Sequence, residues 1–264
     1  MRRVSTETEA VVSITSFDAD LYRLLHRGSP GDVAYYRRIC TGAAQVLELG
    51  CGDGRVSLPL AESGVTVTGI DAHPGMLSAA ESDRARVPIA VRQRLQYVRA
   101  DISNFSLDTR FDRIIAPYTT LYALSPDERA QCLRHVAEHL TPDGRFVFDV
   151  YSAGWMLEEG SYSDPSPILM ARITHDGHMI DVYEQDVHDA TRQHVSVHYI
   201  YEFEEGGVTK VSTYTIEHHY LLLEQIEPTL NAAGLALESI EGDFEGNAFT
   251  DTSARLVVKA RRLT

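Results

Sequence analysis

The sequence is poor in cysteine, and the few cysteines are scattered. Only 3 of 264 residues are cysteine, and Cys40, Cys51 and Cys132 follow neither a disulfide spacing nor a metal-ligand spacing. The chain therefore gives no basis for a disulfide scaffold or a cysteine-ligated metal site. This cysteine usage is typical of a protein from a reducing compartment.

Basic residues are also few, with 24 Lys and Arg against 38 Asp and Glu and a formal net charge of −14. Nucleic-acid binding depends on neutralising phosphates, so this balance argues against a polyanionic substrate. An acidic surface mainly serves solubility and indicates no activity. The chain also lacks an apolar run of about eighteen residues and a charged-then-apolar leader, so we expect a cytoplasmic protein that does not bind membranes.

The rest of the composition is that of an ordinary globular protein, with 44% apolar and 23% charged residues. A chain of 264 residues can bury a sizeable core. It has room for one large α/β domain or for a core with an accessory subdomain. It contains no repeat and no low-complexity segment.

The chain is organised around an apolar run followed by three closely spaced glycines. Residues 46–49 are typical of a buried parallel strand, and Gly50, Gly52 and Gly54 follow at once. Glycine permits positive φ and, without a Cβ, lets a ligand lie against the backbone. Helical spacing resumes at Val56, so the glycines occupy a strand-to-helix turn. Free N–H groups at that helix start would face an anionic group, a carboxylate or a phosphate.

A second apolar run, residues 65–70, ends in Asp71. This acid follows the first glycine by about twenty residues, and there it can accept hydrogen bonds from both ribose hydroxyls of a nucleoside. The spacing predicts the nucleoside-binding half of a Rossmann-like fold.

These residues resemble the motifs of a known family. The segment ELGCGDG at 48–54 resembles the first motif of class I S-adenosylmethionine-dependent methyltransferases, and GID at 69–71 resembles their second. Nicotinamide enzymes use G-x-G-x-x-G, whereas here the third glycine comes one residue early and Glu48 lies on the strand. Both departures favour the methyltransferase family. The resemblance spans residues 46–150 and implies S-adenosyl-L-methionine as the cofactor.

The resemblance also implies where the cofactor binds. Asp71 is expected at the ribose and Met76 against the adenine ring, although simple core packing is an alternative for Met76. Asp101 and the backbone N–H of Ile102 are expected at the edge of the adenine. The expected cofactor-binding residues are Tyr36, Glu48, Gly50, Gly52, Asp71, Ala72, Met76, Asp101, Ile102 and Ala116.

Two helices are predicted before the glycine turn, at residues 17–27 and 32–41. The family commonly uses such helices as a lid over the cofactor. Tyr22, Tyr35 or Tyr36 would then face the methionine end of the cofactor or the acceptor. The alternative is that these tyrosines only pack the helices on the core.

The remaining core elements follow in the order of the family. The predicted strands are 95–100, 111–118, 145–150, 235–241 and 255–260, and the functional loop of the second of these begins at Ala116. The predicted helices are 128–140 and 221–233. We therefore expect an α/β fold, a Rossmann-like seven-stranded sheet with N-terminal lid helices. Its last strand is expected to run antiparallel beside the fifth.

The loop after the fourth strand is expected to face the reacting sulfonium, because ligands of open α/β sheets bind beyond the carboxyl ends of the strands. This loop presents Pro117, Tyr118, Thr119 and Tyr122. Some amine and nucleic-acid methyltransferases carry an N-P-P-Y type motif here, whereas Ala116 lacks the leading polar side chain. This departure lowers the expectation of adenine or glutamine methylation.

The second half of the chain is predicted to form an antiparallel β-meander joined by hairpin turns. Small-molecule methyltransferases acting on glycine and on amino sugars place such a sheet over the active site. The resemblance thus implies lid helices at 1–45, a cofactor-binding core at 46–151 and 221–264, and an inserted substrate-covering sheet at 152–220. In the competing interpretation the sheet stabilises the fold or forms a dimer interface.

Methyl transfer needs mainly orientation of the acceptor, which can contribute roughly 7–11 kcal/mol. A phenol or carbon nucleophile also benefits from a base. The expected catalytic residues are Tyr22, Tyr118, Glu184 and His219. Glu184 lies on a partly apolar strand face, where a carboxylate is either paired or functional. His218 and His219 point to opposite faces of a strand and cannot bind one ion, so no metal site is expected.

The leading hypothesis is methyl transfer from S-adenosyl-L-methionine to a nitrogen, an oxygen or an activated aromatic carbon of a small molecule. The acceptor would be a secondary metabolite or an amino-acid-derived compound. One alternative is a protein of the same fold that binds the cofactor without catalysis, and a less favoured one is a nicotinamide-dependent oxidoreductase. A small-molecule acceptor is the expected partner, without nucleic acid or membrane, and a homodimer stays open.

Overall fold

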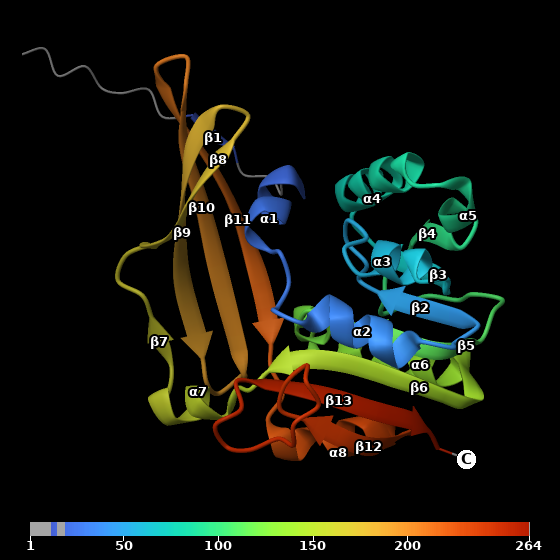
Figure 1. Ribbon diagram of the computed structural model, residues 1–264. Helices are drawn as coiled ribbons and strands as arrows, with labels where there is room; N and C mark the ends of the chain where they lie inside the picture. Colours follow the sequence, from blue (N-terminus) through green and yellow to red (C-terminus); the bar gives the residue numbers. More distant parts are fainter. Residues whose placement is uncertain (1–11, 15–18, 264) are drawn as a thin grey trace, which may run out of the picture. The chain divides into compact units, whose positions relative to one another are not determined.

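The computed structural model describes residues 12–14 and 19–263, and the chain divides into two compact units. The first unit comprises the chain up to Arg27 together with Gly160–Glu217, and the second comprises Gly28–Glu159 together with the chain from His218 onward. Each unit has its own sheet (Figure 1). Each also has its own cluster of buried apolar side chains. None of the described helices is long and apolar enough to cross a membrane.

The second unit is built on a seven-stranded sheet with the strand order β12-β13-β6-β5-β2-β3-β4. Its strands are β2 (Gln45–Leu49), β3 (Thr66–Asp71), β4 (Leu95–Arg99), β5 (Phe111–Ala116), β6 (Leu140–Tyr151), β12 (Leu235–Glu241) and β13 (Arg255–Arg262). Neighbours from β4 to β6 run parallel, whereas β13 runs antiparallel to β6 and to β12. The predicted fold class is confirmed, including the antiparallel strand beside the fifth.

Helices of the second unit begin at recognisable local signals. α6 begins at Pro126, and its preceding residue Ser125 forms a capping box with Glu128. α4 begins at Pro74, where the missing N–H of proline costs no hydrogen bond. The helices are α2 (Asp32–Cys40), α3 (Ser57–Glu62), α4 (Pro74–Arg86), α5 (Ile89–Arg92), the 3₁₀ helix η1 (Thr120–Ala123), α6 (Pro126–His139), α7 (Gly154–Glu159) and α8 (Leu223–Ala232).

The core of this unit lies between the sheet and its helices. Side chains of α2 and α3 pack with β2, β3 and β5 in one buried cluster, which includes Val46, Leu60 and Ile115. Strands covered in this way bury nearly continuous apolar runs, as the sequence of β2 and β5 predicts. Because β2 and β5 are parallel neighbours, their carboxyl ends bring the glycine turn and the loop after β5 to the same edge of the sheet.

The first unit holds the meander, with the strand order β1-β11-β10-β9-β7 and with β8 paired to β9. Its elements are β1 (Val12–Ile14), α1 (Ala19–Leu25), β7 (Tyr162–Ser163), β8 (Ile168–His175), β9 (His178–Asp189), β10 (His194–Glu205) and β11 (Val208–His219), whose last two residues belong to the second unit. Asp176 and Gly177 turn between β8 and β9 with φ of 47° and 80°, the positive values that a two-residue type I′ hairpin turn requires. Leu21 of α1 packs with Ile180, Val182 and Tyr201 of the sheet.

Candidate functional site

The glycine turn after β2 has a backbone conformation and close contacts that favour glycine. Gly50, Gly52 and Gly54 have φ of 64°, 55° and 82°, the left-handed region that other residues rarely adopt. A Cβ on Gly50 would lie 2.7 Å from Cγ2 of Thr120, and one on Gly54 would lie 2.0 Å from the hydroxyl oxygen of Tyr97. The backbone of these three glycines therefore lies at the edge of the sheet without a side chain of its own.

Asp71 lies directly beside this turn. Its Oδ2 accepts a hydrogen bond from the backbone N–H of Gly52 at 2.9 Å, and its Oδ1 accepts one from His73 at 2.8 Å. Met76 is buried nearby, and its Cε lies 3.0 Å from the position that a Cβ on Gly52 would take. The structure thus brings Gly50, Gly52, Asp71 and Met76 together, with exposed Ala72 next to them.

Asp101 and Ile102 follow β4, the neighbour of β3 in the sheet. The carboxylate of Asp101 is exposed, and its Oδ1 accepts hydrogen bonds from the N–H and the hydroxyl of Ser103, both at 2.8 Å. These contacts fix the turn after β4. The two predicted acids, Asp71 and Asp101, therefore stand at the carboxyl ends of adjacent strands.

Glu48 lies inside the protein rather than on its surface. It is buried on β2 and accepts a short hydrogen bond from the hydroxyl of Ser57 at the start of α3. Burial raises the pKa of Glu48 to about 8, against the lowering effects of Ser57 and of the Arg55 guanidinium. Glu48 thus joins β2 to α3 beneath the glycine turn, and its place in cofactor binding stays a prediction.

The loop after β5 contains two consecutive residues in an unusual conformation. Tyr118 and Thr119 have φ of 56° and 66°, a region that costs energy for any residue except glycine. The N–H of Tyr118 donates to Asp149 Oδ1 at 2.9 Å, and the N–H of Thr119 donates to the Asp149 carbonyl at 3.0 Å. Asp149 of β6 therefore holds this strained loop directly after Ala116.

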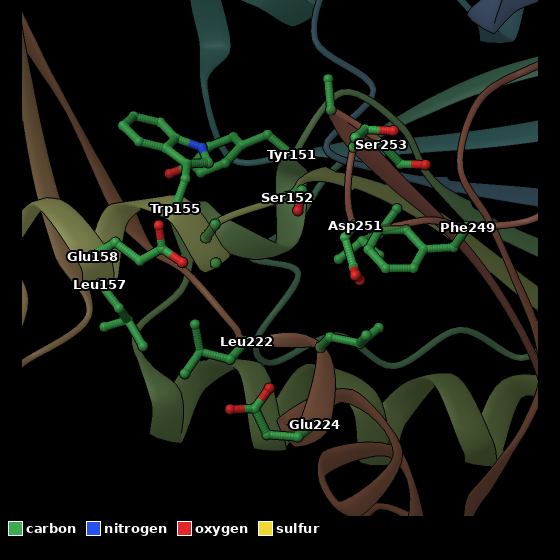
Figure 2. A pocket seen from close by; sticks show the side chains of 16 residues that line it. Tyr151, Ser152, Trp155, Leu157, Glu158, Leu222, Glu224, Phe249, Asp251 and Ser253 are labelled. Carbon is green, nitrogen blue, oxygen red and sulfur yellow. The ribbon is translucent and has the colours of Figure 1, made fainter.

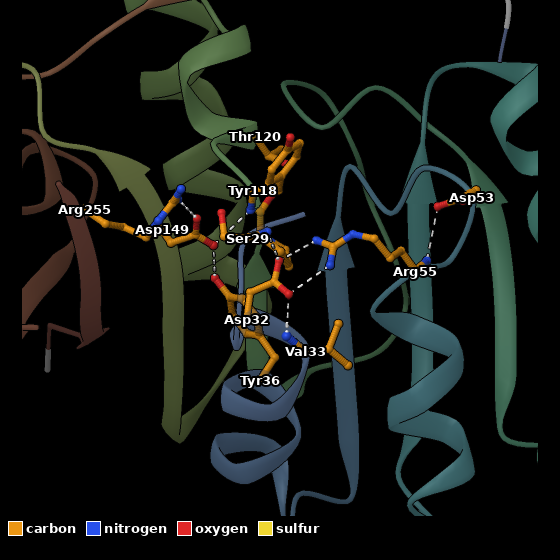
Figure 3. A network of polar contacts seen from close by, with 11 residues as sticks. Ser29, Asp32, Val33, Tyr36, Asp53, Arg55, Tyr118, Thr120, Asp149 and Arg255 are labelled. Carbon is orange, nitrogen blue, oxygen red and sulfur yellow. Dashed lines mark hydrogen bonds and ion pairs between the residues drawn. The ribbon is translucent and has the colours of Figure 1, made fainter. Parts of the chain in front are cut away.

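Asp149 is the centre of a buried polar network (Figure 3). It is fully buried and accepts a hydrogen bond from the Tyr36 hydroxyl at 2.6 Å, and Arg255 of β13 forms an ion pair with its Oδ2. Burial raises the pKa of Asp149, although the positive charge of Arg255 opposes the shift. Tyr36, predicted at the cofactor, is itself fully buried, with its hydroxyl bound to Asp149.

A second ion pair connects the glycine turn to α2. The two terminal guanidinium nitrogens of Arg55, Nη1 and Nη2, contact the carboxylate of Asp32 at 3.0 and 2.8 Å, and Asp32 is buried. The Arg55 guanidinium carbon also lies 5.5 Å from the centroid of the Tyr118 ring, within cation–π range. Burial raises the pKa of Tyr118, so its phenol is neutral near pH 7. Figure 3 shows Arg55 reaching toward Asp32 and Tyr118.

The sequence pattern did not single out Asp149, Arg55 or Thr120 as parts of the site. A signal for Asp149 was present, because an acid in the apolar segment FVFDV must be paired when it is buried. No signal marks Arg55, since its partner Asp32 precedes it by 23 residues on another element.

The predicted catalytic residues belong to both units. In the first unit, Tyr22 stacks on His26 with ring centroids 4.2 Å apart, and His26 Nε2 lies 2.7 Å from the Tyr214 hydroxyl. Glu184 is half-buried on β9, opposite Tyr199 of β10. In the second unit, Tyr118 lies in the loop after β5, and the backbone carbonyl of His219 accepts a hydrogen bond from Arg129. The roles of these four residues in catalysis stay predictions.

Comparison with known proteins agrees with this geometry. Residues 46–144 match the sequence model of a family described as a methyltransferase domain. The chain is an S-adenosylmethionine-dependent methyltransferase. Its cofactor is S-adenosyl-L-methionine, and it transfers the methyl group to a small molecule. In the described part of this methyltransferase, no group of three or more His, Cys, Asp or Glu residues is arranged to hold a metal ion.

Two relatives match the methyltransferase over most of their length. The dTDP-3-amino-3,6-dideoxy-alpha-D-glucopyranose N,N-dimethyltransferase of Streptomyces fradiae is 28% identical over 240 residues, covering 86% of this chain and 87% of the relative. The cypemycin N-terminal methyltransferase of a Streptomyces species is 26% identical and covers 82% of each chain. Among solved structures, the CcbJ methyltransferase of Streptomyces caelestis is 27% identical, with a TM-score of 0.73 over 90% of this chain and 91% of that one.

Proposed function

We propose that this methyltransferase transfers the methyl group to the nitrogen of an amine on a small molecule, an amino sugar or an amino-acid-derived compound. The observation that carries the proposal is the pair of relatives that align over more than four-fifths of this chain. By their names, one forms a dimethylated amino sugar and the other methylates the N-terminus of cypemycin.

The chemistry of the loop after β5 supports an amine acceptor. A neutral amine attacks with its own lone pair and needs orientation more than a strong base. The Tyr118 phenol, whose pKa is raised by burial, is protonated near pH 7 and is suited to hydrogen bonding rather than to proton abstraction. The strained backbone of Tyr118 and Thr119, held by Asp149, gives this loop a fixed shape for orienting an acceptor.

The residues around the glycine turn fit the cofactor, which supplies a methyl group on its sulfonium when bound. We propose that Asp71 accepts hydrogen bonds from the ribose hydroxyls, because each of its oxygens has a lone pair beyond the backbone contact it already makes. Met76 offers a polarizable surface to the adenine beside Gly52. Asp101 and Ile102 would bind the adenine edge, and the backbone of Gly50 and Gly52 would face the amino-acid end.

The direct test is incubation of the purified enzyme with S-adenosyl-L-methionine and a panel of amino sugars, amino acids, phenols and indoles. Mass spectrometry detects each methylated product, and NMR assigns the methylated atom. We expect methylation of an amine nitrogen, with the hydroxyl-bearing analogue of the same compound left unmodified. Methylation of an oxygen or a carbon, with amines unmodified, would overturn the proposal.

A further inference from the structure

A cavity of about 720 Å³ lies in the second unit, apart from the glycine turn. It opens where β6 ends, between α7, the first residues of α8 and the segment before β13 (Figure 2). The buried side chains of Ala153 and Leu256 form part of its wall. Its volume is in the range of small-molecule sites, roughly 300–1,000 Å³. None of the residues expected to bind the cofactor lines it.

Much of the lining is aromatic or aliphatic and open to solvent. Trp155 is 52% exposed, and Leu157 and Leu223 are also exposed. The half-buried rings of Tyr151 and Phe249 complete the apolar part. Large apolar side chains exposed together around one cavity are typical of a binding surface rather than of scattered surface residues.

The charges in the lining are all negative. Glu158, Glu224 and Asp251 line the cavity, and it contains no Lys, Arg or His. Within the described part of the chain, none of these three carboxylates has a hydrogen bond or an ion pair. Figure 2 shows their side chains around the same space, from α7, from α8 and from the segment before β13.

We propose that this cavity binds an organic cation, a protonated or quaternary amine with an apolar body. The carboxylates provide charge-assisted contacts for the cationic group, and the faces of Trp155 and Tyr151 provide cation–π contacts. The apolar walls cover the body of the ligand. An anion is excluded, because three carboxylates without partners would face it. The inference goes beyond the proposed function and does not depend on which acceptor atom the enzyme methylates.

The sequence offers a direct probe of this cavity, because Trp155 is the only tryptophan in the chain. Its fluorescence, excited so that tyrosines do not contribute, reports binding beside it. The probe is benzyltrimethylammonium, compared with two molecules of similar size, neutral benzyl alcohol and anionic phenylacetate. We expect saturable binding of the cation, at least about tenfold weaker binding of the alcohol, and no binding of phenylacetate.

Variants test whether the change in Trp155 fluorescence comes from binding in this cavity. The triple variant Glu158→Gln, Glu224→Gln, Asp251→Asn should weaken binding of the cation at least about tenfold. Glu62→Gln, an exposed acid at the end of α3, should leave it unchanged. Calorimetric titration repeats both measurements without fluorescence. Saturating S-adenosylhomocysteine should leave binding of the probe unchanged.

Three outcomes would overturn the proposal. The first is equal binding of cation and alcohol, and the second is loss of probe binding in the presence of S-adenosylhomocysteine. The third is Trp155 emission that responds to protein concentration but not to the cation, which would identify an interface between copies of the chain. The experiment measures binding of the probe and not methyl transfer. Failure of this proposal can therefore be distinguished from failure of the enzyme to methylate an amine.

Discussion

Asp71 ends β3 beside the glycine turn, and both of its oxygens accept backbone hydrogen bonds there. We expect Asp71→Ala to weaken binding of S-adenosylhomocysteine by on the order of 1.5–3 kcal/mol, the usual loss for a charge-assisted hydrogen bond. Calorimetric titration measures the affinity, and circular dichroism checks that the variant is folded. A folded variant with the parent's affinity would refute the assignment of Asp71 to the ribose.

Glu48 links stability to pH through its raised pKa. Its pKa is about 8 in the folded protein against an ordinary value near 4.5, so the folded state holds a proton that the unfolded state releases. The stability that this proton provides is complete below pH 4.5 and declines as the pH rises toward 8, by at most about 1.4 kcal/mol per pH unit.

We expect Glu48→Gln to flatten this decline, because the amide keeps an acceptor for Ser57 but does not titrate. Urea unfolding at several pH values between 4.5 and 8 measures the slope for parent and variant. Ser57→Ala serves as a control, since it removes the hydrogen bond and leaves the titrating carboxyl. Identical slopes in parent and Glu48→Gln would show that Glu48 is ionised in the folded state.

At the scale of elements, Asp149 connects three segments that the chain order keeps apart. Its carboxylate binds Tyr36 of α2, the backbone after β5, and Arg255 of β13. Asp149→Asn removes the negative charge and leaves Arg255 without its ion pair. We expect a loss of about 3 kcal/mol in the free energy of unfolding, as is usual when one partner of a buried pair is removed.

Chemical denaturation measures this loss, and the double variant Asp149→Asn, Arg255→Met is the control. Removing both charges should restore part of the stability, because no unpaired charge then remains. The single variant should also lower kcat more than it weakens cofactor binding, because the strained Tyr118–Thr119 backbone loses its anchor. Unchanged stability and turnover in Asp149→Asn would contradict the role given to this network.

Local sequence signals predicted most elements, and the exceptions have physical causes. The segment Thr141-Pro142-Asp143-Gly144 has the composition of a turn, yet the structure continues it within β6. Leu140 pairs with Phe111 of β5, and the register shifts along β5 between Phe111 and Arg113. Sheet pairing thus overrides the local preference of proline and glycine there, because a register shift absorbs the irregular segment.

At the scale of the whole molecule, the catalytic residues predicted from the sequence are divided between the two units. Glu184 lies in the first unit and His219 in the second. If the inserted sheet takes part in acceptor binding, at least one of Glu184→Gln and His219→Ala should lower acceptor affinity or turnover tenfold or more, about 1.4 kcal/mol. Cofactor affinity should stay unchanged in both variants.

Steady-state kinetics with the acceptor found in the panel above, together with titration of S-adenosylhomocysteine, provide the measurement. Glu202→Gln, a half-buried acid of β10, is a matched control for Glu184→Gln on the same sheet. If both test variants keep the parent's acceptor kinetics, the predicted role of the sheet in acceptor binding is wrong. Loss of cofactor binding in both Glu184→Gln and His219→Ala would also contradict the predicted role of the sheet in acceptor binding.

The sequence by itself determined the order of the sheet elements, the glycine turn and the acid at the end of β3. These features depend on neighbours in the chain. Alternation and apolar runs specify strands, helical spacing specifies helices, and glycine accepts the positive φ values of the turn more readily than any other residue. Asp71 could also be recognised from the sequence. Its distance from Gly50 along the chain places it at the carboxyl end of β3, the strand next to β2.

Only the tertiary structure decided which partners Asp149, Arg55 and Glu48 contact and how deeply they are buried. Tyr36 and Arg255 meet Asp149 across 113 and 106 residues of sequence, and no local pattern encodes contacts between elements so far apart. The raised pKa values of Glu48 and Asp149 come from burial, which depends on every element packed around them. The left-handed backbone of Tyr118 and Thr119 is likewise maintained by a carboxylate and a carbonyl of β6, because neither residue adopts it readily by itself.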